Sequence, residues 1–327
     1  LKRPCALPLI RFPHRAFKMM QVLTWFGSCM IASLVAISES QVSGQIYDFK
    51  ESAFFASLAS VAYCDNEASV LNWTCAPCTD SKTPLVPGKI KIIDAGRSQA
   101  NRLIVGKLRD QNGCLMTIRG SVNTANWMTD LHFWNMKPSS FEDCKGCRVH
   151  SGFYGDWKKL RGPAVQALEE VGCPANSTDN ILYVTGHSMG AALTHLAMFT
   201  LEDAGYHIGK SYSFEAPRIG NKVFSNVFES RFTTKFPLFR ITHSMDPIVH
   251  LPPKNLGYEH VQTEVFYDKT GTYKVCDTVE DKACADQYWD LPSLIAFHSG
   301  DHCASPLVPN GDICDPIGCS ASAELIV

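Results

Sequence analysis

The feature that most constrains this chain of 327 residues is a serine between two glycines, Gly186-His187-Ser188-Met189-Gly190. A short apolar run over residues 180–185 precedes it, and good helix formers over residues 191–199 follow. The sequence therefore predicts a buried strand, a sharp turn that carries Ser188, and a helix. The two glycines leave room for the turn and for close packing of strand against helix.

A serine at such a turn is typical of the nucleophile of an α/β-hydrolase. The turn exposes the Ser188 Oγ, and the N–H of Met189, at the start of the helix, would face a developing oxyanion. Gly-x-Ser-x-Gly alone arises by chance in about one chain in ten of this length. Its position between a strand and a helix makes the nucleophile interpretation much more specific.

The nucleophile needs a base and an acid that orients the base, and in this class the acid precedes the histidine in the chain. Asp246 is the preferred acid because it follows a predicted buried strand, residues 238–243. Glu215, which ends the predicted strand 210–215, is the alternative, and Asp203 also follows the serine.

Four histidines follow Asp246 in the chain. His302 is the preferred base and His298 the alternative, because both lie in a late loop. His250 is too near Asp246 in sequence to reach across the sheet edge, and His260 lies in a strand pattern that suggests a structural role.

The second oxyanion donor must come from a loop after an early central strand. The sequence predicts a hairpin of strands 102–108 and 114–118, followed by Arg119-Gly120-Ser121. Ser121 is therefore the expected second donor, through its N–H and its hydroxyl.

Six ordered blocks of the sequence together resemble the class 3 (fungal-type) lipases. These blocks are Ile118-Arg119-Gly120-Ser121, Asn126-Trp127-x-x-Asp130-Leu131, Val149-His150-Ser151-Gly152-Phe153, Gly186-His187-Ser188-Met189-Gly190, Ala216-Pro217-Arg218-Ile219-Gly220-Asn221 and Asp246-Pro247-x-x-x-Leu251-Pro252. The chain departs from the family after Asp301-His302, where the aromatic residue that commonly follows two positions on is absent.

The resemblance implies an α/β-hydrolase fold, with a mostly parallel central sheet, flanking helices and a short helical lid. It implies hydrolysis of triacylglycerols or related esters without a cofactor or a metal. It also implies Ser188 as nucleophile, Asp246 as acid, and Ser121 with Met189 as the oxyanion hole. Residues 122–131 would form the lid, with Trp127 facing the pocket when closed and lipid when open.

The remaining patterns predict one domain over residues 45–327 with an irregular tail from about residue 285. Further elements are expected as helices over residues 51–64, 153–171 and 222–231, a break at Gly162-Pro163, a strand over residues 89–95, and a hairpin over residues 260–267 and 272–275.

Residues 1–44 are expected to be a basic leader and a signal peptide cleaved near Ser38, with an uncleaved membrane anchor as the alternative. Two of the 14 cysteines, Cys5 and Cys29, lie in this leader, and the even number that remains favours disulfides in a secreted protein over a zinc site. The spacing suggests local loops closed by Cys276 with Cys284 and by Cys314 with Cys319, although sequence does not fix the pairing.

The net charge of −2 and the lack of a basic run after the leader argue against nucleic acid as a partner. We expect a secreted, monomeric triacylglycerol lipase that forms an acyl-enzyme and is activated at a lipid–water interface. The alternatives are a phospholipase or a feruloyl-type esterase on the same scaffold, and an inactive lipase-like binding protein.

Overall fold

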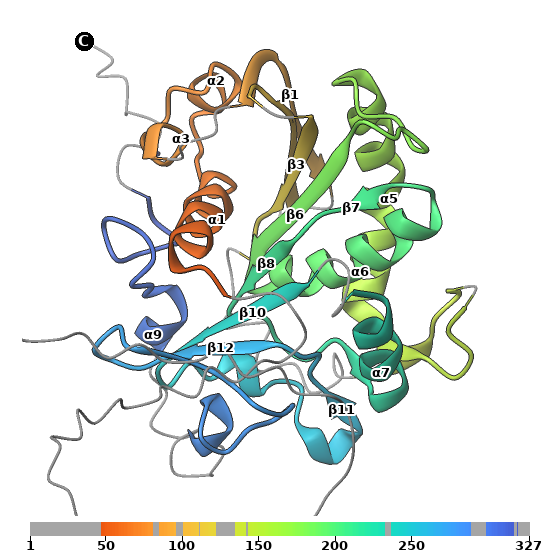
Figure 1. Cartoon of the computed structure of the whole chain (residues 1–327), viewed down its shortest axis with the longest axis vertical. Helices are drawn as coiled ribbons and strands as arrows, with labels where there is room; N and C mark the ends of the chain where they lie inside the picture. Colours follow the sequence, from red (N-terminus) through yellow and green to blue (C-terminus); the bar gives the residue numbers. More distant parts are fainter. Residues whose placement is uncertain are drawn as a thin grey trace, which may run out of the picture. The chain divides into compact units, whose positions relative to one another are not determined.

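A mixed nine-stranded sheet runs through the described part of the molecule (Figure 1). Its strands follow the order β1-β2-β3-β6-β8-β10-β12-β13, and β7 pairs with β6 beside this path. The bounds are β1 Leu85–Ala95, β2 Asn101–Leu108, β3 Gly113–Ile118, β6 Ile181–His187, β7 His207–Ile208, β8 Ser211–Phe214, β10 Leu238–His243, β12 Glu264–Tyr267 and β13 Tyr273–Val275.

The structure is a computed structural model that describes residues 47–80, 85–95, 101–110, 112–121, 135–141, 143–232, 237–288, 299–316 and 319. The predicted signal peptide, the predicted lid with Trp127, and His298 lie outside these residues. Among the described helices, none is both long enough and apolar enough to span a membrane.

The centre of the sheet is parallel, and this brings the ends of several strands to one edge. β3, β6, β8, β10 and β12 run parallel to one another, whereas β1 and β2 on one side and β13 on the other join by antiparallel pairing. Connections between parallel strands must cross over the sheet, which is why helices cover its faces. This confirms the predicted fold class.

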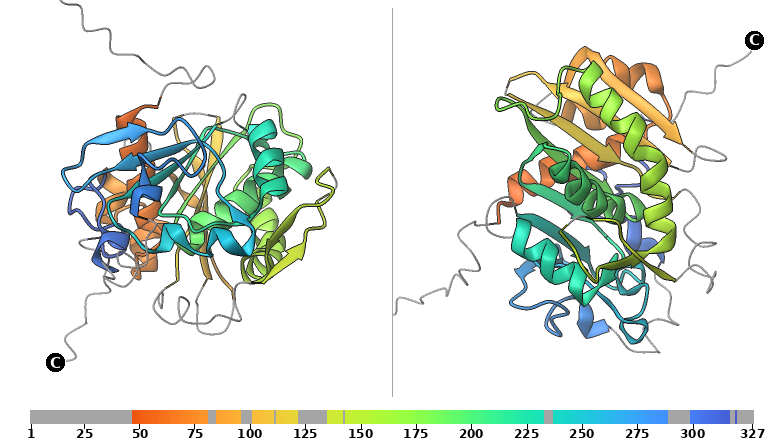
Figure 2. Two further views of the ribbon diagram at one scale, coloured as in Figure 1. Left: turned by 90° about the horizontal axis from the view of Figure 1, so that it is seen from below. Right: turned by 90° about the vertical axis from the view of Figure 1, so that its right-hand side faces the viewer.

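Helices cover both faces of the sheet (Figure 2). α1 (Phe49–Val61) packs on one face, and α5 (Ser151–Glu170), α6 (Met189–Asp203) and α7 (Lys222–Phe232) lie on the other. A hydrophobic core lies on each face of the sheet. Alternate residues of β2 pack into one core or the other, because successive side chains of a strand point to opposite faces. Leu103 packs toward α5 and α6, and Ile104 packs on the side of α1.

Smaller elements complete the described chain. A second, four-stranded sheet has the order β11-β9-β5-β4, with β4 Met136–Pro138, β5 Arg148–His150, β9 Gly220–Asn221 and β11 Tyr258–Glu259. The short helices are α2 Glu67–Leu71, α3 Ala76–Asp80, η3 Ile248–His250, η4 Lys254–Leu256, η5 Ala285–Tyr288 and α9 Ser299–Cys303.

Two predictions of local structure are wrong. The helix predicted to break at Gly162-Pro163 is continuous from Ser151 to Glu170, because core side chains on both sides of the proline, such as Trp157 and Leu168, keep one buried face. That burial offsets the backbone hydrogen bond that a proline removes. The strand predicted over residues 260–267 is shorter than expected, since β12 begins only at Glu264, although it forms the predicted hairpin with β13.

The twelve cysteines from Cys64 onward form six disulfides. The pairs are Cys64–Cys319, Cys75–Cys78, Cys114–Cys173, Cys144–Cys147, Cys276–Cys284 and Cys303–Cys314. The expected local loop between Cys276 and Cys284 is present, but the one between Cys314 and Cys319 is wrong. Cys314 pairs back to the segment of α9, and Cys319 reaches the end of α1.

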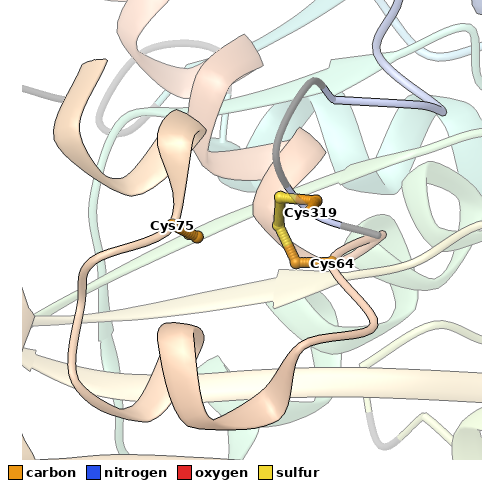
Figure 3. A group of neighbouring side chains, drawn as sticks. All are labelled: Cys64, Cys75 and Cys319. Carbon is orange, nitrogen blue, oxygen red and sulfur yellow. A yellow bond between two sulfur atoms is a disulfide. The ribbon is translucent and has the colours of Figure 1, made fainter. Parts of the chain in front are cut away.

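The Cys64–Cys319 disulfide fastens the end of α1 to the tail, beside Cys75 (Figure 3). The sulfur atoms of these three residues lie within 4.8 Å of one another. All three are in disulfides here, and a disulfide sulfur is not the thiolate that binds zinc.

We predict that replacing both Cys64 and Cys319 with serine lowers the free energy of unfolding by about 2–5 kcal/mol, the usual cost of removing a native disulfide. The bond spans 255 residues of sequence and so restricts the unfolded chain strongly. Urea unfolding followed by circular dichroism measures the loss. The matched control replaces Cys75 and Cys78, only three residues apart, and should cost less. Equal losses would contradict the prediction.

Candidate active site

Ser188 lies at the turn between β6 and α6, in the backbone conformation that the motif predicts. Its φ of 59° and ψ of −127° place it in a region that residues with side chains rarely adopt. The Ser188 N–H donates to the carbonyl oxygen of Phe214 in β8 at 2.9 Å, which fixes the turn against the neighbouring strand. Gly186 and Gly190 pack so closely that a Cβ on Gly186 would lie 2.7 Å from the carbonyl carbon of Gly190.

The structure brings Ser188, His302 and Asp246 into one hydrogen-bonded row. His302 Nε2 lies 2.8 Å from Ser188 Oγ, and His302 Nδ1 lies 2.9 Å from Asp246 Oδ2. A carboxylate only accepts hydrogen bonds, so Nδ1 carries the proton and Nε2 is left to accept from the serine hydroxyl. This is the tautomer that a general base requires.

Asp246 is completely buried, and its surroundings favour the charged form. Burial alone raises the pKa of the carboxyl group. The charge and hydrogen bond of His302, a hydrogen bond from Glu215 and the Ile248 N–H outweigh burial, so the pKa of Asp246 is lower than usual. The Ile248 N–H donates to Asp246 Oδ1 at 2.9 Å, which leaves Oδ2 for His302.

Several contacts fix the segment that carries His302. The disulfide Cys303–Cys314 adjoins the histidine, and Asp301 Oδ2 accepts the Met245 N–H at 3.1 Å. The His302 carbonyl oxygen also lies 2.9 Å from His187 Nε2. The base is thus tied both to the loop of Asp246 and to the residue before the nucleophile.

The two predicted oxyanion donors follow neighbouring parallel strands, β3 and β6. Met189 begins α6, and Ser121 follows β3, whose last residue Ile118 is paired with Gly186. A Cβ on Gly120 would lie 2.7 Å from the Cβ of Ser188, so the backbone that carries Ser121 passes directly beside the nucleophile.

Tyr63, at the end of α1, is a site residue that sequence reasoning missed. Its hydroxyl accepts the Gly120 N–H at 3.1 Å and lies 2.7 Å from His187 Nδ1. Burial lowers the pKa of His187 to about 3, so the ring is neutral; its Nε2–H donates to the His302 carbonyl, and Nδ1 accepts from Tyr63. The only sequence clue was the position of Tyr63 before Cys64, which anchors α1.

The alternative candidates occupy other places. Asp203 ends α6, far along the helix from Ser188, and pairs with Arg231 at 2.7 Å. His260 Nε2 donates to the Val249 carbonyl oxygen at 2.6 Å, in keeping with a structural role.

His250 is buried within η3, where its own carbonyl oxygen accepts from Arg218. Burial lowers the pKa of its ring to about 4. Glu215 contacts Asp246 rather than His302, and it is considered further below.

Comparison with known proteins finds class 3 lipases along part of the sequence and fungal lipases among structures of the same fold. Residues 115–256 match the class 3 lipases. Over 150 residues the chain is 35% identical to the secreted mono- and diacylglycerol lipase A of Penicillium cyclopium, covering 46% of each chain. It is 27% identical to the secreted mono- and diacylglycerol lipase 1 of Fusarium solani, covering 72% of this chain and 71% of the relative.

Among solved structures, a lipase from Rhizopus microsporus var. chinensis superposes with a TM-score of 0.64 at 22% identity, covering 84% of this chain and 91% of the other. The fold is therefore that of the α/β-hydrolases. The sequence match over residues 115–256 and the shared fold support the class 3 lipases as the family of this chain. The aligned part spans about half the length of the Penicillium relative.

We predict that Gly120→Ala lowers both stability and the reactivity of Ser188. The added Cβ would lie 2.9 Å from the His187 carbonyl oxygen and would also meet the Tyr63 hydroxyl, an overpacking that typically costs about 1–3 kcal/mol. Thermal unfolding and the labelling rate with a fluorophosphonate measure the two effects. Gly155→Ala, in α5 with open space around it, is the control and should be neutral or stabilising. Indistinguishable variants would contradict the close approach.

Proposed function

We propose that the chain is a serine hydrolase that cleaves acylglycerol esters through an acyl-enzyme. The hydrogen-bonded row from Asp246 through His302 to Ser188, at 2.9 and 2.8 Å, is the observation that carries this proposal. The relatives that are named as mono- and diacylglycerol lipases support acylglycerols as the substrate class.

In the first half-reaction, His302 Nε2 takes the proton of Ser188 while Oγ attacks the ester carbonyl carbon. The N–H groups of Met189 and Ser121 stabilise the oxyanion of the tetrahedral intermediate. Asp246 stabilises the imidazolium, which then gives its proton to the departing glycerol oxygen. An acyl-serine remains.

In the second half-reaction, water replaces the alcohol. His302 takes a proton from the water as it attacks the acyl carbon, and a second tetrahedral intermediate forms in the same oxyanion hole. The proton returns to Ser188 Oγ, and the fatty acid leaves.

We predict that Ser188→Ala and His302→Ala each lower kcat about 10⁴-fold or more, because members of such a triad act as a unit. His298→Ala is the matched control, since His298 was the alternative base, and it should keep the activity. Hydrolysis of tributyrin, followed by acid release at constant pH, measures all three. An inactive His298→Ala beside an active His302→Ala would overturn the assignment of the base.

The rates at which the unmutated chain hydrolyses a set of esters would define the substrate class. Triacylglycerol, diacylglycerol and monoacylglycerol of the same fatty acid should be compared with a phospholipid and a feruloyl ester. Preference for any glyceride supports the proposal. Preference for the phospholipid or for the feruloyl ester supports the corresponding alternative on this scaffold.

We further propose that residues 122–131 form a lid that opens at a lipid–water interface. The segment carries apolar side chains, Trp127, Met128 and Leu131, among polar ones, as an amphipathic helix does. Exposing these side chains is unfavourable in water and favourable against lipid.

We predict that Trp127→Ala lowers activity on emulsified long-chain esters about fivefold more than on a soluble short-chain ester, because contacts of an aromatic ring with apolar groups contribute about 1 kcal/mol. Initial rates below and above the solubility limit of each ester measure this ratio. Equal losses on both substrates would refute the lid.

We also propose a secreted, monomeric protein with a cleaved leader over residues 1–44 and one hydrolase domain over residues 45–327. The six disulfides suit an oxidising compartment, and the named relatives are secreted lipases. Its partner would be a lipid surface rather than nucleic acid or another protein.

A further inference from the structure

Glu215 is a second buried carboxyl group at the site, and the transfer of a proton from Ser188 does not use it. Glu215 is the first residue after β8, and Asp246 lies in the turn after β10. These strands are parallel neighbours, with Phe214 opposite Ile241, so their carboxyl ends meet at one edge of the sheet. Glu215 is only 3% exposed.

The backbone of Glu215 is held between the acid strand and the nucleophile. Its N–H donates to the Ile241 carbonyl oxygen in β10 at 2.9 Å, and the carbonyl just before it, of Phe214, accepts the Ser188 N–H at 2.9 Å. Its φ of 52° lies in the left-handed region, where glycine is the usual residue. A residue with a side chain thus stands in a strained conformation, and its carboxyl group contacts Asp246.

The carboxyl groups of Glu215 and Asp246 are hydrogen-bonded to each other, so one of them must carry a proton. Asp246 already accepts from His302 and from the Ile248 N–H, which favour its charged form. Glu215 accepts one N–H, from His243 at 3.1 Å. Burial, and then the charge of Asp246, raise the pKa of Glu215 well above its usual value. The proton therefore belongs to Glu215.

The other charged and titratable groups around the pair leave this proton in place. Arg240 of β10 lowers the pKa of Glu215, but its guanidinium is paired with Glu264 at 2.9 Å. Burial makes His187 and His250 neutral, with pKa values of about 3 and about 4. The His243 ring donates from Nδ1 to the Asp301 carbonyl oxygen at 3.3 Å.

We propose that Glu215 is a positioning residue whose protonated carboxyl donates to Asp246 and holds that carboxylate toward His302. The pair then carries one negative charge, which matches the single positive charge that His302 gains when it takes the Ser188 proton. An ionised Glu215 would add a second negative charge. That charge would raise the pKa of His302 and slow the transfer of its proton to the departing glycerol oxygen. The inference rests on the proposed function, because it gives Glu215 a purpose only through the base.

The test compares Glu215→Gln, which keeps a donor, with Glu215→Met, which keeps volume but removes the donor. The readouts are tributyrin hydrolysis and the rate of Ser188 labelling by a fluorophosphonate across pH 4.5–9. We expect Glu215→Gln within about threefold of the unmutated rate and Glu215→Met about tenfold or more below it, the usual effect of losing a hydrogen bond to a charged group. We also expect the acid side of the Glu215→Met profile to move to higher pH, since Asp246 would attract the His302 proton more strongly.

Asp286→Asn is the control for loss of a buried carboxyl that does not contact Asp246, since Asp286 pairs with Lys254 at 2.7 Å. It should lower the melting temperature without moving the pH profile. If Glu215→Met shows the unmutated rate and profile, or if Glu215→Gln falls as far as Glu215→Met, Glu215 does not act through a donated hydrogen bond and the inference is overturned.

A second readout does not depend on catalysis. Unfolded Glu215 loses its proton above its usual pKa, whereas folded Glu215 keeps it, so this residue makes the folded state less stable as pH rises. The melting temperature of Glu215→Gln minus that of the unmutated chain should therefore increase from pH 4.5 to pH 8. A difference that stays constant with pH would contradict a protonated Glu215. An unmutated chain that neither hydrolyses esters nor reacts with the probe would refute the proposed function instead, while this difference still tests the proton.

Discussion

The site depends on how closely three backbone segments approach one another at the turn of Ser188. Glycine at 120, 186 and 190 removes the Cβ atoms that would hold β3, β6 and the start of α6 apart. Because these segments touch, the backbone at Gly120 passes beside Ser188, and Met189 follows the serine directly at the start of α6. Hydrogen bonds within the backbone, including that from Ser188 to Phe214, then fix an arrangement that side chains alone would leave adjustable.

Much of the candidate site could be predicted because its parts are encoded in short stretches of sequence. The strand, glycines and helix around Ser188 predict the turn without any distant contact. Asp246 could be placed because the ends of neighbouring parallel strands meet at one edge. The predicted order of acid and histidine led to His302, although distance in sequence gave no reason to prefer it strongly over His298.

The remainder depends on contacts between distant segments, which one sequence does not reveal. Tyr63 joins the site because α1 packs across the sheet, and Cys319 pairs with Cys64 rather than with the nearer Cys314 for the same reason. Pro163 misled the local prediction, since packing of α5 against the core outweighs a missing N–H. The sequence indicates Glu215 as a possible acid. Only its contact with Asp246 in the fold shows that Glu215 is the protonated carboxyl group and Asp246 the charged one.

Residues 64 to 319 form a covalent ring, because the Cys64–Cys319 disulfide joins them across 255 residues of sequence. Ser188, Asp246 and His302 all belong to this ring. A protease that cuts one exposed peptide bond inside it opens the ring but releases no fragment, and both sides of the cut remain one molecule. In an environment rich in digestive proteases, such a chain tolerates nicking that would divide a linear polypeptide into separate pieces.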